Sequence, residues 1–283
     1  MDRGVGAGRE WGRVERLVAG AIRLVPGARD LAELHEKAIP QKDQLCGPFW
    51  GALTLAAAGH PADQDEVALR AGTTLAEGDP AEWLPPGASP RTDYVLPLPV
   101  SPDESSSGTS ASGLARSIEA LSENALRVVP VAGPWTAESV VSLVEVVASG
   151  VLECSLVANL RTGCLWGSKP PARHLLNYLL GLPVEVPAPD WDCGHFLAIV
   201  ASLSGPGGAL VVLRDTYAEL GWGGYHLQPA GAVAAALERG DGHEGGVLCV
   251  LEPAGAEALA RGLEGAGFEL RHWDNGTPDG GAG

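Results

Sequence analysis

The stretch QKDQLCGPFW, residues 41–50, places one cysteine directly before a Gly-Pro pair, and an alanine-rich apolar run follows it. The run CGPFWGALTLAAAG is apolar nearly all round, which predicts a buried helix that begins at Cys46 and ends at Gly59. Proline is tolerated in a first helical turn, because its missing N–H would be unpaired there anyway. The stretch therefore places the Cys46 thiol at a helix N-terminus.

That position makes Cys46 a candidate nucleophile. A thiol reacts as its thiolate, and the free N–H groups and partial positive charge of a helix N-terminus favour that anion. Taken alone, Cys46 could equally be a core thiol, since free cysteine is among the most buried residue types. The choice depends on what the rest of the chain brings beside it.

Two residues in the second half of the chain complete a candidate triad. His195 opens the strand-like run HFLAIVASL (195–203), and Asp215 closes the next strand-like run, ALVVLRD (209–215), after a glycine-containing turn. In an antiparallel hairpin, the first residue of one strand lies near the last residue of its partner. The sequence therefore predicts that His195 and Asp215 are neighbours, as a general base and its orienting carboxylate must be.

Two glutamines supply candidates for a fourth catalytic part. A tetrahedral oxyanion needs hydrogen-bond donors, and a side-chain amide beside the backbone N–H of the cysteine can provide them. Gln41 and Gln44 both precede Cys46. The residues alone do not decide between them.

Four residues are candidates for substrate binding. Gly47 and Gly194 each adjoin a triad residue, and we expect Trp191 and Trp222 to form walls of the cleft beside the histidine.

Two competing interpretations involve nearby residues. Asp192, Cys193 and His195 could form a metal site, but ligands this crowded rarely close a tetrahedral cage and no second cluster completes it. We therefore expect no metal and no cofactor. His226, in GGYHLQP, could compete as the base, although we expect it to be a surface histidine of the sheet.

The ordered set Gln41 or Gln44, Cys46-Gly-Pro, Gly-His195-Phe and Leu-Arg-Asp215 resembles the papain-like cysteine peptidase superfamily over residues 40–240. It is most similar to the bacterial branch of bacteriocin-processing, double-glycine leader peptidases. The resemblance implies an oxyanion-hole glutamine, with the family spacing favouring Gln41. It also implies a nucleophilic Cys46, a general-base His195 and an orienting Asp215.

The pattern of the whole chain predicts one α+β domain over residues 1–270, with a helical first half and antiparallel strands in the second half. The resemblance makes this a papain-like fold, with the nucleophile helix packed on the C-terminal sheet. We expect helices over 9–24 and 29–38 and from Asp63 to Arg70. Two segments, 76–111 and 165–192, are expected to be insertions in that fold, and 271–283 a disordered tail.

The totals exclude several classes of partner. The 19 Lys and Arg and 35 Asp and Glu give a net charge of −16, which argues against nucleic acid and anionic membranes. No apolar run reaches the ~18 residues of a membrane span, and no signal peptide is evident. Five widely spaced cysteines fit reduced thiols in a cytoplasm.

The sequence thus predicts a cysteine-dependent acyl-transfer enzyme acting on a peptide, amide or carrier-bound acyl substrate through a thioester intermediate. Hydrolysis is the default. An acyltransferase or amide-forming enzyme of a natural-product pathway is the first alternative, and a catalytically silent module that binds a peptide or carrier protein is the second.

Overall fold

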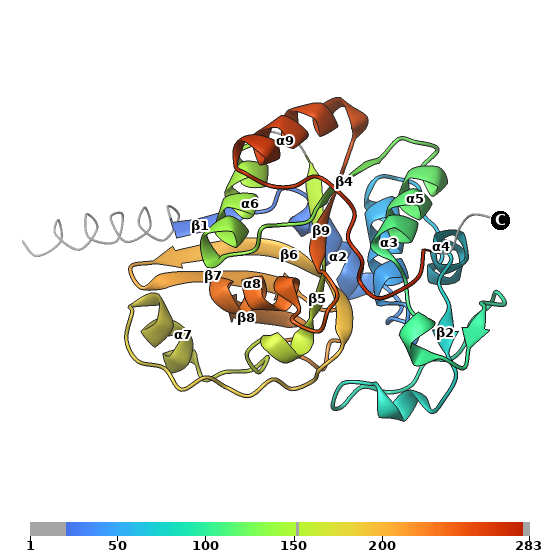
Figure 1. Ribbon diagram of the computed structural model, residues 1–283, viewed down its shortest axis with the longest axis horizontal. Coiled ribbons are helices and arrows are strands. Elements are labelled where there is room, and N and C mark those ends of the chain that lie inside the picture. Colours follow the sequence, from blue (N-terminus) through green and yellow to red (C-terminus); the bar gives the residue numbers. More distant parts are fainter. Residues whose placement is uncertain (1–20, 151–152, 280–283) are drawn as a thin grey trace, which may run out of the picture.

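The computed structural model describes residues 21–150 and 153–279 (Figure 1). In these residues the helices gather mainly in the first half of the chain and an antiparallel sheet in the second, so the fold is α+β as predicted. The helices are α2 (Ala28–Lys37), α3 (Cys46–Ala57), α4 (Gln64–Ala71), α5 (Ala111–Leu121), α6 (Ala137–Ser149), α7 (Ala172–Leu179), α8 (Ala230–Glu238) and α9 (Pro253–Gly265).

The main sheet is antiparallel throughout and has the order β4-β9-β5-β6-β7-β8. A further strand, β1, extends it by pairing with β6 beyond the end of β5. The strands are β1 (Ile22–Leu24), β4 (Arg127–Val131), β5 (Cys154–Arg161), β6 (Gly194–Gly205), β7 (Gly208–Arg214), β8 (Tyr225–Pro229) and β9 (Gly246–Leu251).

The helices gather in groups around this sheet. Helices α3, α4 and α5 contact one another and lie together on one side of the molecule, whereas α7 and α8 lie beside β7 and α6 packs on α9 (Figure 1). Helix α3 also contacts β6 directly. This contact brings the first half of the chain onto the strand that carries His195.

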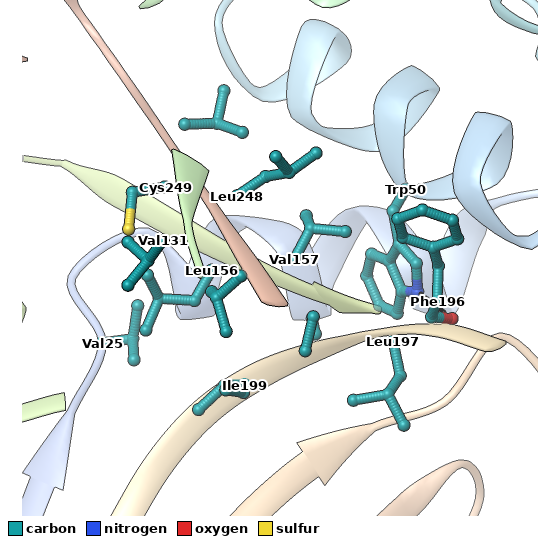
Figure 2. Close-up of a cluster of buried hydrophobic side chains, with 14 of the residues drawn as sticks. Val25, Trp50, Val131, Leu156, Val157, Phe196, Leu197, Ile199, Leu248 and Cys249 are labelled. Atoms are coloured by element: carbon teal, nitrogen blue, oxygen red, sulfur yellow. Dashed lines mark hydrogen bonds between the residues drawn. The ribbon is translucent and has the colours of Figure 1, made fainter. Parts of the chain in front are cut away.

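The core joins α3 to the sheet. Trp50 and Phe196 lie side by side in Figure 2, and the Trp50 indole Nε1 donates a hydrogen bond to the Phe196 carbonyl at 3.2 Å. Aliphatic side chains of the central strands, such as Leu156, Val157 and Ile199, continue this core away from the pair and are at most 1 % exposed. Burying each such side chain stabilises the fold by about 1.5–3 kcal/mol. Cys46 is thus held against the sheet by the helix that it begins.

The expected helix over 9–24 is wrong at its C-terminal end. Residues 9–20 lie outside the described residues, and Ile22–Leu24 form β1, paired with residues 201–203 of β6. The helical spacing of apolar residues did not decide the structure here, because hydrogen bonds to the open edge of β6 outweigh a local helical preference.

The segment expected to be a disordered tail packs against the protein as far as Asp279. Trp273 and Asn275 are buried, the Asn275 amide donates to the Thr109 carbonyl at 3.0 Å, and Asp279 pairs with Arg116 of α5. Glycine and proline made this segment look unstructured. Its order comes from side-chain contacts with remote parts of the chain.

The two expected insertions contain short elements of their own. The 76–111 crossing includes the strand pair β2 (Leu75–Ala76) and β3 (Val100–Ser101), together with the 3-10 turns Pro80–Glu82 and Glu104–Ser106. The 165–192 segment contains α7. Both connect elements of the main body by long, mostly irregular paths.

Candidate active site

Cys46 is the first residue of α3 and is half-buried. The helix start has no side-chain cap, whereas α4 and α5 are capped by Asp63 and Ser110. Instead, the backbone N–H groups of Gly47 and Phe196 are hydrogen bonded to the Cys46 sulfur. The Gly47 N–H, which a cap would otherwise occupy, and the Phe196 N–H of β6 are thus available to stabilise a thiolate.

His195 and Asp215 lie together in the interior, beside Cys46. Their side chains are 1 % and 0 % exposed, and His195 Nε2 lies 3.1 Å from Asp215 Oδ1. The same Oδ1 accepts the Tyr217 backbone N–H at 3.0 Å. Because Nε2 faces the carboxylate, Nδ1 is the ring nitrogen available to the Cys46 thiol, with which His195 is hydrogen bonded.

The three groups shift one another's protonation. Burial raises the pKa of Cys46. The hydrogen bond and charge of His195 lower it by more than burial raises it, so the pKa lies below that of an ordinary thiol. Burial lowers the pKa of His195, yet Asp215 and the Cys46 thiolate raise it to about 10. Burial raises the pKa of Asp215, and His195 more than offsets this, giving about 2. The arrangement favours a thiolate–imidazolium pair backed by a carboxylate.

The two glutamines have different surroundings. Gln44 has a left-handed backbone, with φ of 61°, and its amide hydrogen bonds to both the N–H and the carbonyl of Ala76, so it holds β2 in place. Gln41 is buried and donates one amide hydrogen to the Tyr217 hydroxyl at 2.9 Å. The second N–H of Gln41 has no hydrogen-bond partner among the described residues, so of the two glutamines Gln41 has the donor that an oxyanion would need.

Aromatic rings enclose His195 on two sides. The Trp191 ring lies edge-on at 5.1 Å between centroids, and the Tyr217 ring stacks at 6.0 Å. The Trp191 indole donates to the Trp83 carbonyl at 3.0 Å, which ties the 76–111 crossing to the histidine. These rings fix the imidazole plane and limit access of water.

A cavity of about 460 Å³ opens above the triad. Cys46, His195, both glutamines, Trp191 and Gly194 all line it, as does part of the 76–111 crossing. We name it the Cys46 pocket. Its far side is closed by Arg239, His243 and the 275–277 part of the tail.

Two of the predicted substrate-binding residues are placed elsewhere. Trp222 is 45 % exposed and does not line the Cys46 pocket, because it lies in the turn before β8. Gly47 is buried under the pocket, where an added Cβ would meet the Phe196 ring at 3.2 Å. Gly47 therefore allows the close approach of α3 to β6, while Gly194 lines the pocket mouth.

The side chains of Asp192, Cys193 and His195 do not converge. Asp192 accepts two hydrogen bonds from Arg161, at 2.7 and 2.9 Å. The backbone N–H of Cys193 donates to the Thr162 hydroxyl at 3.0 Å. Within the described residues, no group of three or more His, Cys, Asp or Glu side chains could hold a metal ion. In the same part of the chain, no helix has the length and apolar character needed to cross a membrane.

Sequence reasoning missed several residues around the triad. His226 is buried, not on the surface as expected, and its Nε2 lies 3.6 Å from Asp215 Oδ2. The alternation of side chains along β8 could have indicated this position, because His226 pairs with Leu213 of β7, two residues before Asp215. Tyr217, two residues after Asp215, had no sequence signal beyond that proximity.

Comparison with protein families adds one finding. The model of a family of unknown function, DUF6885, matches residues 25–274. The chain belongs to the DUF6885 family. The matched region includes Cys46, His195 and Asp215, and ends just before the tail residues that close the Cys46 pocket. No curated protein matches the chain.

Proposed function

We propose that this DUF6885 chain is a cysteine-dependent acyl-transfer enzyme with a papain-like arrangement of its site. The observation that carries the proposal is the hydrogen-bonded series Cys46–His195–Asp215 at the floor of a cavity. Nucleophile, base and orienting group come from three separate elements: α3, the start of β6 and the end of β7. A structural thiol needs neither a histidine partner nor a carboxylate behind that partner.

The reaction follows from these positions. The Cys46 thiolate attacks the carbonyl carbon of an amide or thioester, and the resulting oxyanion accepts hydrogen bonds from the Gln41 amide and the Cys46 backbone N–H. His195 gives its proton to the leaving amine or thiol as the C–N or C–S bond breaks, which leaves the acyl group on Cys46. Asp215 holds the imidazole orientation throughout.

The second half-reaction decides between hydrolase and transferase. His195 takes a proton from water or from an amine, whose oxygen or nitrogen then attacks the thioester and releases Cys46. Water gives a peptidase or amidase, and an amine gives an acyltransferase or amide-forming enzyme. Incubating thioester and amide donors with and without amines, and following the acyl-enzyme by intact mass, separates these two outcomes.

The alkylation rate of Cys46 tests the proposal. Because His195 lowers the thiol pKa, we expect iodoacetamide at pH 7 to label Cys46 ahead of the other four thiols. The rate should fall on the acid side, where the thiolate gains a proton, and stay nearly level toward pH 9. His195→Gln should move this profile toward that of a free thiol and slow labelling at pH 7 by about tenfold or more.

The control thiol is Cys164, which is also half-buried but is not in the Cys46 pocket. Its labelling should be unchanged in His195→Gln. Equal labelling of both thiols, each with the profile of a free thiol, would reject the enzyme and favour a silent binding module.

A further inference from the structure

Arg214, the last residue of β7, is a buried cation that no carboxylate of the described residues contacts, and the charges of Glu36 and Asp215 act on it only from a longer distance. It is 4 % exposed, and no carboxylate lies within ion-pair distance of it in the described part of the chain. The other buried Lys and Arg side chains described, Lys42 and Arg239, pair with Asp65 at 2.8 Å and Asp241 at 3.0 Å. Burying a charge without a contacting partner is costly. The position of Arg214 therefore suggests that an anion from outside the chain binds beside it.

The contacts of Arg214 fix its orientation and leave a donor unused. Nη1 donates to the Gly223 carbonyl, Nη2 donates to His35 Nδ1 at 2.7 Å, and the guanidinium lies 4.1 Å from the centre of the Tyr225 ring. The Nε–H has no hydrogen-bond partner. Burial and the Arg214 charge lower the pKa of His35 to about 4, so His35 is neutral and adds no charge.

Arg214 lines a second cavity, of about 440 Å³, which we name the Arg214 groove. Its floor contains the buried side chains of His35, Gln41, Arg214, Thr216 and Tyr217. Two of these, Gln41 and Tyr217, also line the Cys46 pocket, so the hydrogen-bonded Gln41–Tyr217 pair is a shared wall. An occupant of the groove is therefore adjacent to the reacting centre.

The polar atoms of the groove indicate the chemistry of that occupant. Two residues that line the groove each have a buried polar atom without a hydrogen-bond partner: Arg214 has its Nε–H donor and Gln41 its Oε1 acceptor. Arg91 lies at the rim, but so do the exposed carboxylates Glu36 and Glu219. This mixture suits one carboxylate next to an N–H group, and it disfavours a phosphate or another polyanion.

We propose that the Arg214 groove binds the free carboxylate of an amino acid or short peptide, the amine partner of the acyl transfer. The assignment of that ligand as the leaving or accepting amine rests on the proposed function. Binding of the carboxylate itself does not.

The test is direct binding to the full chain carrying Cys46→Ala, which prevents turnover and leaves the groove untouched. The probes are glycylglycine and glycylglycine amide, compared by isothermal titration calorimetry at pH 7. A charge-assisted hydrogen bond is worth about 1.5–3 kcal/mol, so the free acid should bind at least about tenfold more tightly than the amide. Equal affinities of acid and amide would overturn the proposal.

Two variants locate the binding. Arg214→Gln should remove the preference for the acid. Because that buried substitution could also unfold the chain, Ala218→Trp provides a second arm: Ala218 is exposed on the groove wall, and an indole there should block both probes. The matched control is Ala254→Trp, at an exposed position on α9, which should bind as the parent does. Unchanged binding in Ala218→Trp would place the ligand elsewhere and reject the groove.

The two proposals fail separately. If Cys46 labels as an ordinary thiol while glycylglycine still binds in the groove, the acyl-transfer function is wrong and the carboxylate site stands. If Cys46 labels as expected and acid and amide bind alike, the carboxylate site is wrong and the enzyme stands.

Discussion

At the scale of single residues, the candidate site depends on how the two oxygens of Asp215 are occupied. Oδ1 has His195 Nε2 and the Tyr217 N–H as close partners. Oδ2 is buried and has no hydrogen bond, and His226 Nε2 lies 3.6 Å from it. Burial lowers the pKa of His226, so the imidazole is neutral at pH 7 and its ring N–H can face this oxygen as a hydrogen-bond donor. We therefore expect His226 to help to position the carboxylate beside His195.

His226→Leu should therefore lower the reactivity of Cys46, although it leaves Cys46, His195 and Asp215 themselves unchanged. Loss of this donor leaves Oδ2 without support, which costs about 1 kcal/mol and should slow Cys46 alkylation at pH 7 by about fivefold. With Oδ2 less well supported, Asp215 should stabilise the His195 imidazolium less, and the acid limb of the labelling profile should move to higher pH. Labelling rates between pH 4 and pH 9 measure both effects.

His226→Gln is the matched variant, because its amide can still donate to Oδ2. It should recover most of the parental rate. If leucine and glutamine slow alkylation equally while urea unfolding shows equal stability, His226 only fills space beside the aspartate.

At the scale of elements, one irregularity in β6 determines whether the triad can form. The β6–β7 hairpin begins with Gly205 opposite Gly208, and the register shifts between Ile199 and Ala201, so Val200 is an extra residue. Beyond that bulge Ala198 lies opposite Arg214, and continuing the register places Asp215 opposite Leu197. Leu197 and His195 share a face of the strand, because side chains alternate with period two.

Without the bulge, Asp215 would lie opposite Ala198 and point away from His195. Apolar, strand-like runs separated by a glycine-containing turn predicted the two strands, and hence the proximity of their ends. They could not predict the bulge, because every residue of 196–201 is apolar and none punctuates the run. The N-terminus of α3 was predictable for the opposite reason: the Gly-Pro pair after Cys46 is a local signal that no tertiary contact overrides.

Helix packing gives a stability prediction at this scale. Gly113 lies in α5 where that helix crosses α4, and an added Cβ would lie 2.2 Å from the Ala71 carbonyl oxygen. Backbone cannot move aside easily, so Gly113→Ala should destabilise the fold by about 1–3 kcal/mol. The control is Gly231→Ala in α8, where the nearest atom is 4.0 Å from the new Cβ. That variant should be neutral or stabilising by about 0.4–1 kcal/mol.

Urea unfolding followed by circular dichroism measures both changes. Equal midpoints for the two alanine variants would mean that α4 and α5 can separate to admit a methyl group, and that their close crossing is not needed for stability.

At the scale of the whole molecule, two segments that looked irregular in sequence form part of the wall of the Cys46 pocket. The 76–111 crossing contributes Trp83, Ser105 and residues 107–109 to the Cys46 pocket, and the tail contributes residues 275–277. The two segments also hold each other: the Asn275 amide donates to the Thr109 carbonyl at 3.0 Å and the Thr277 hydroxyl to the Ser107 carbonyl at 3.1 Å. Composition identifies such segments as lying outside regular helices and strands. Their path is determined by contacts with residues that are distant in the sequence.

This closure gives a test of access to Cys46. A chain ending at Asp274 keeps the buried Trp273, whose indole donates to Asn159 at 3.4 Å, but loses the three tail residues that line the pocket. The core contacts of α3 with β6 do not involve the tail, so this chain should stay folded and keep its triad. We expect a bulky maleimide to label Cys46 severalfold faster than in the full chain, while the rate with iodoacetamide changes little.

A chain ending at Asp279 is the control, because it retains the tail contacts with Thr109, Ser107 and Arg116 and should label as the full chain does. The ratio of the two labelling rates separates the possible causes. Opening of a lid raises the rate of the large reagent alone, since the thiolate fraction is set by His195, which the tail residues leave in place. An equal rise in the labelling rate with both reagents would mean that the tail stabilises the fold around α3. The tail would then not control which molecules enter the Cys46 pocket.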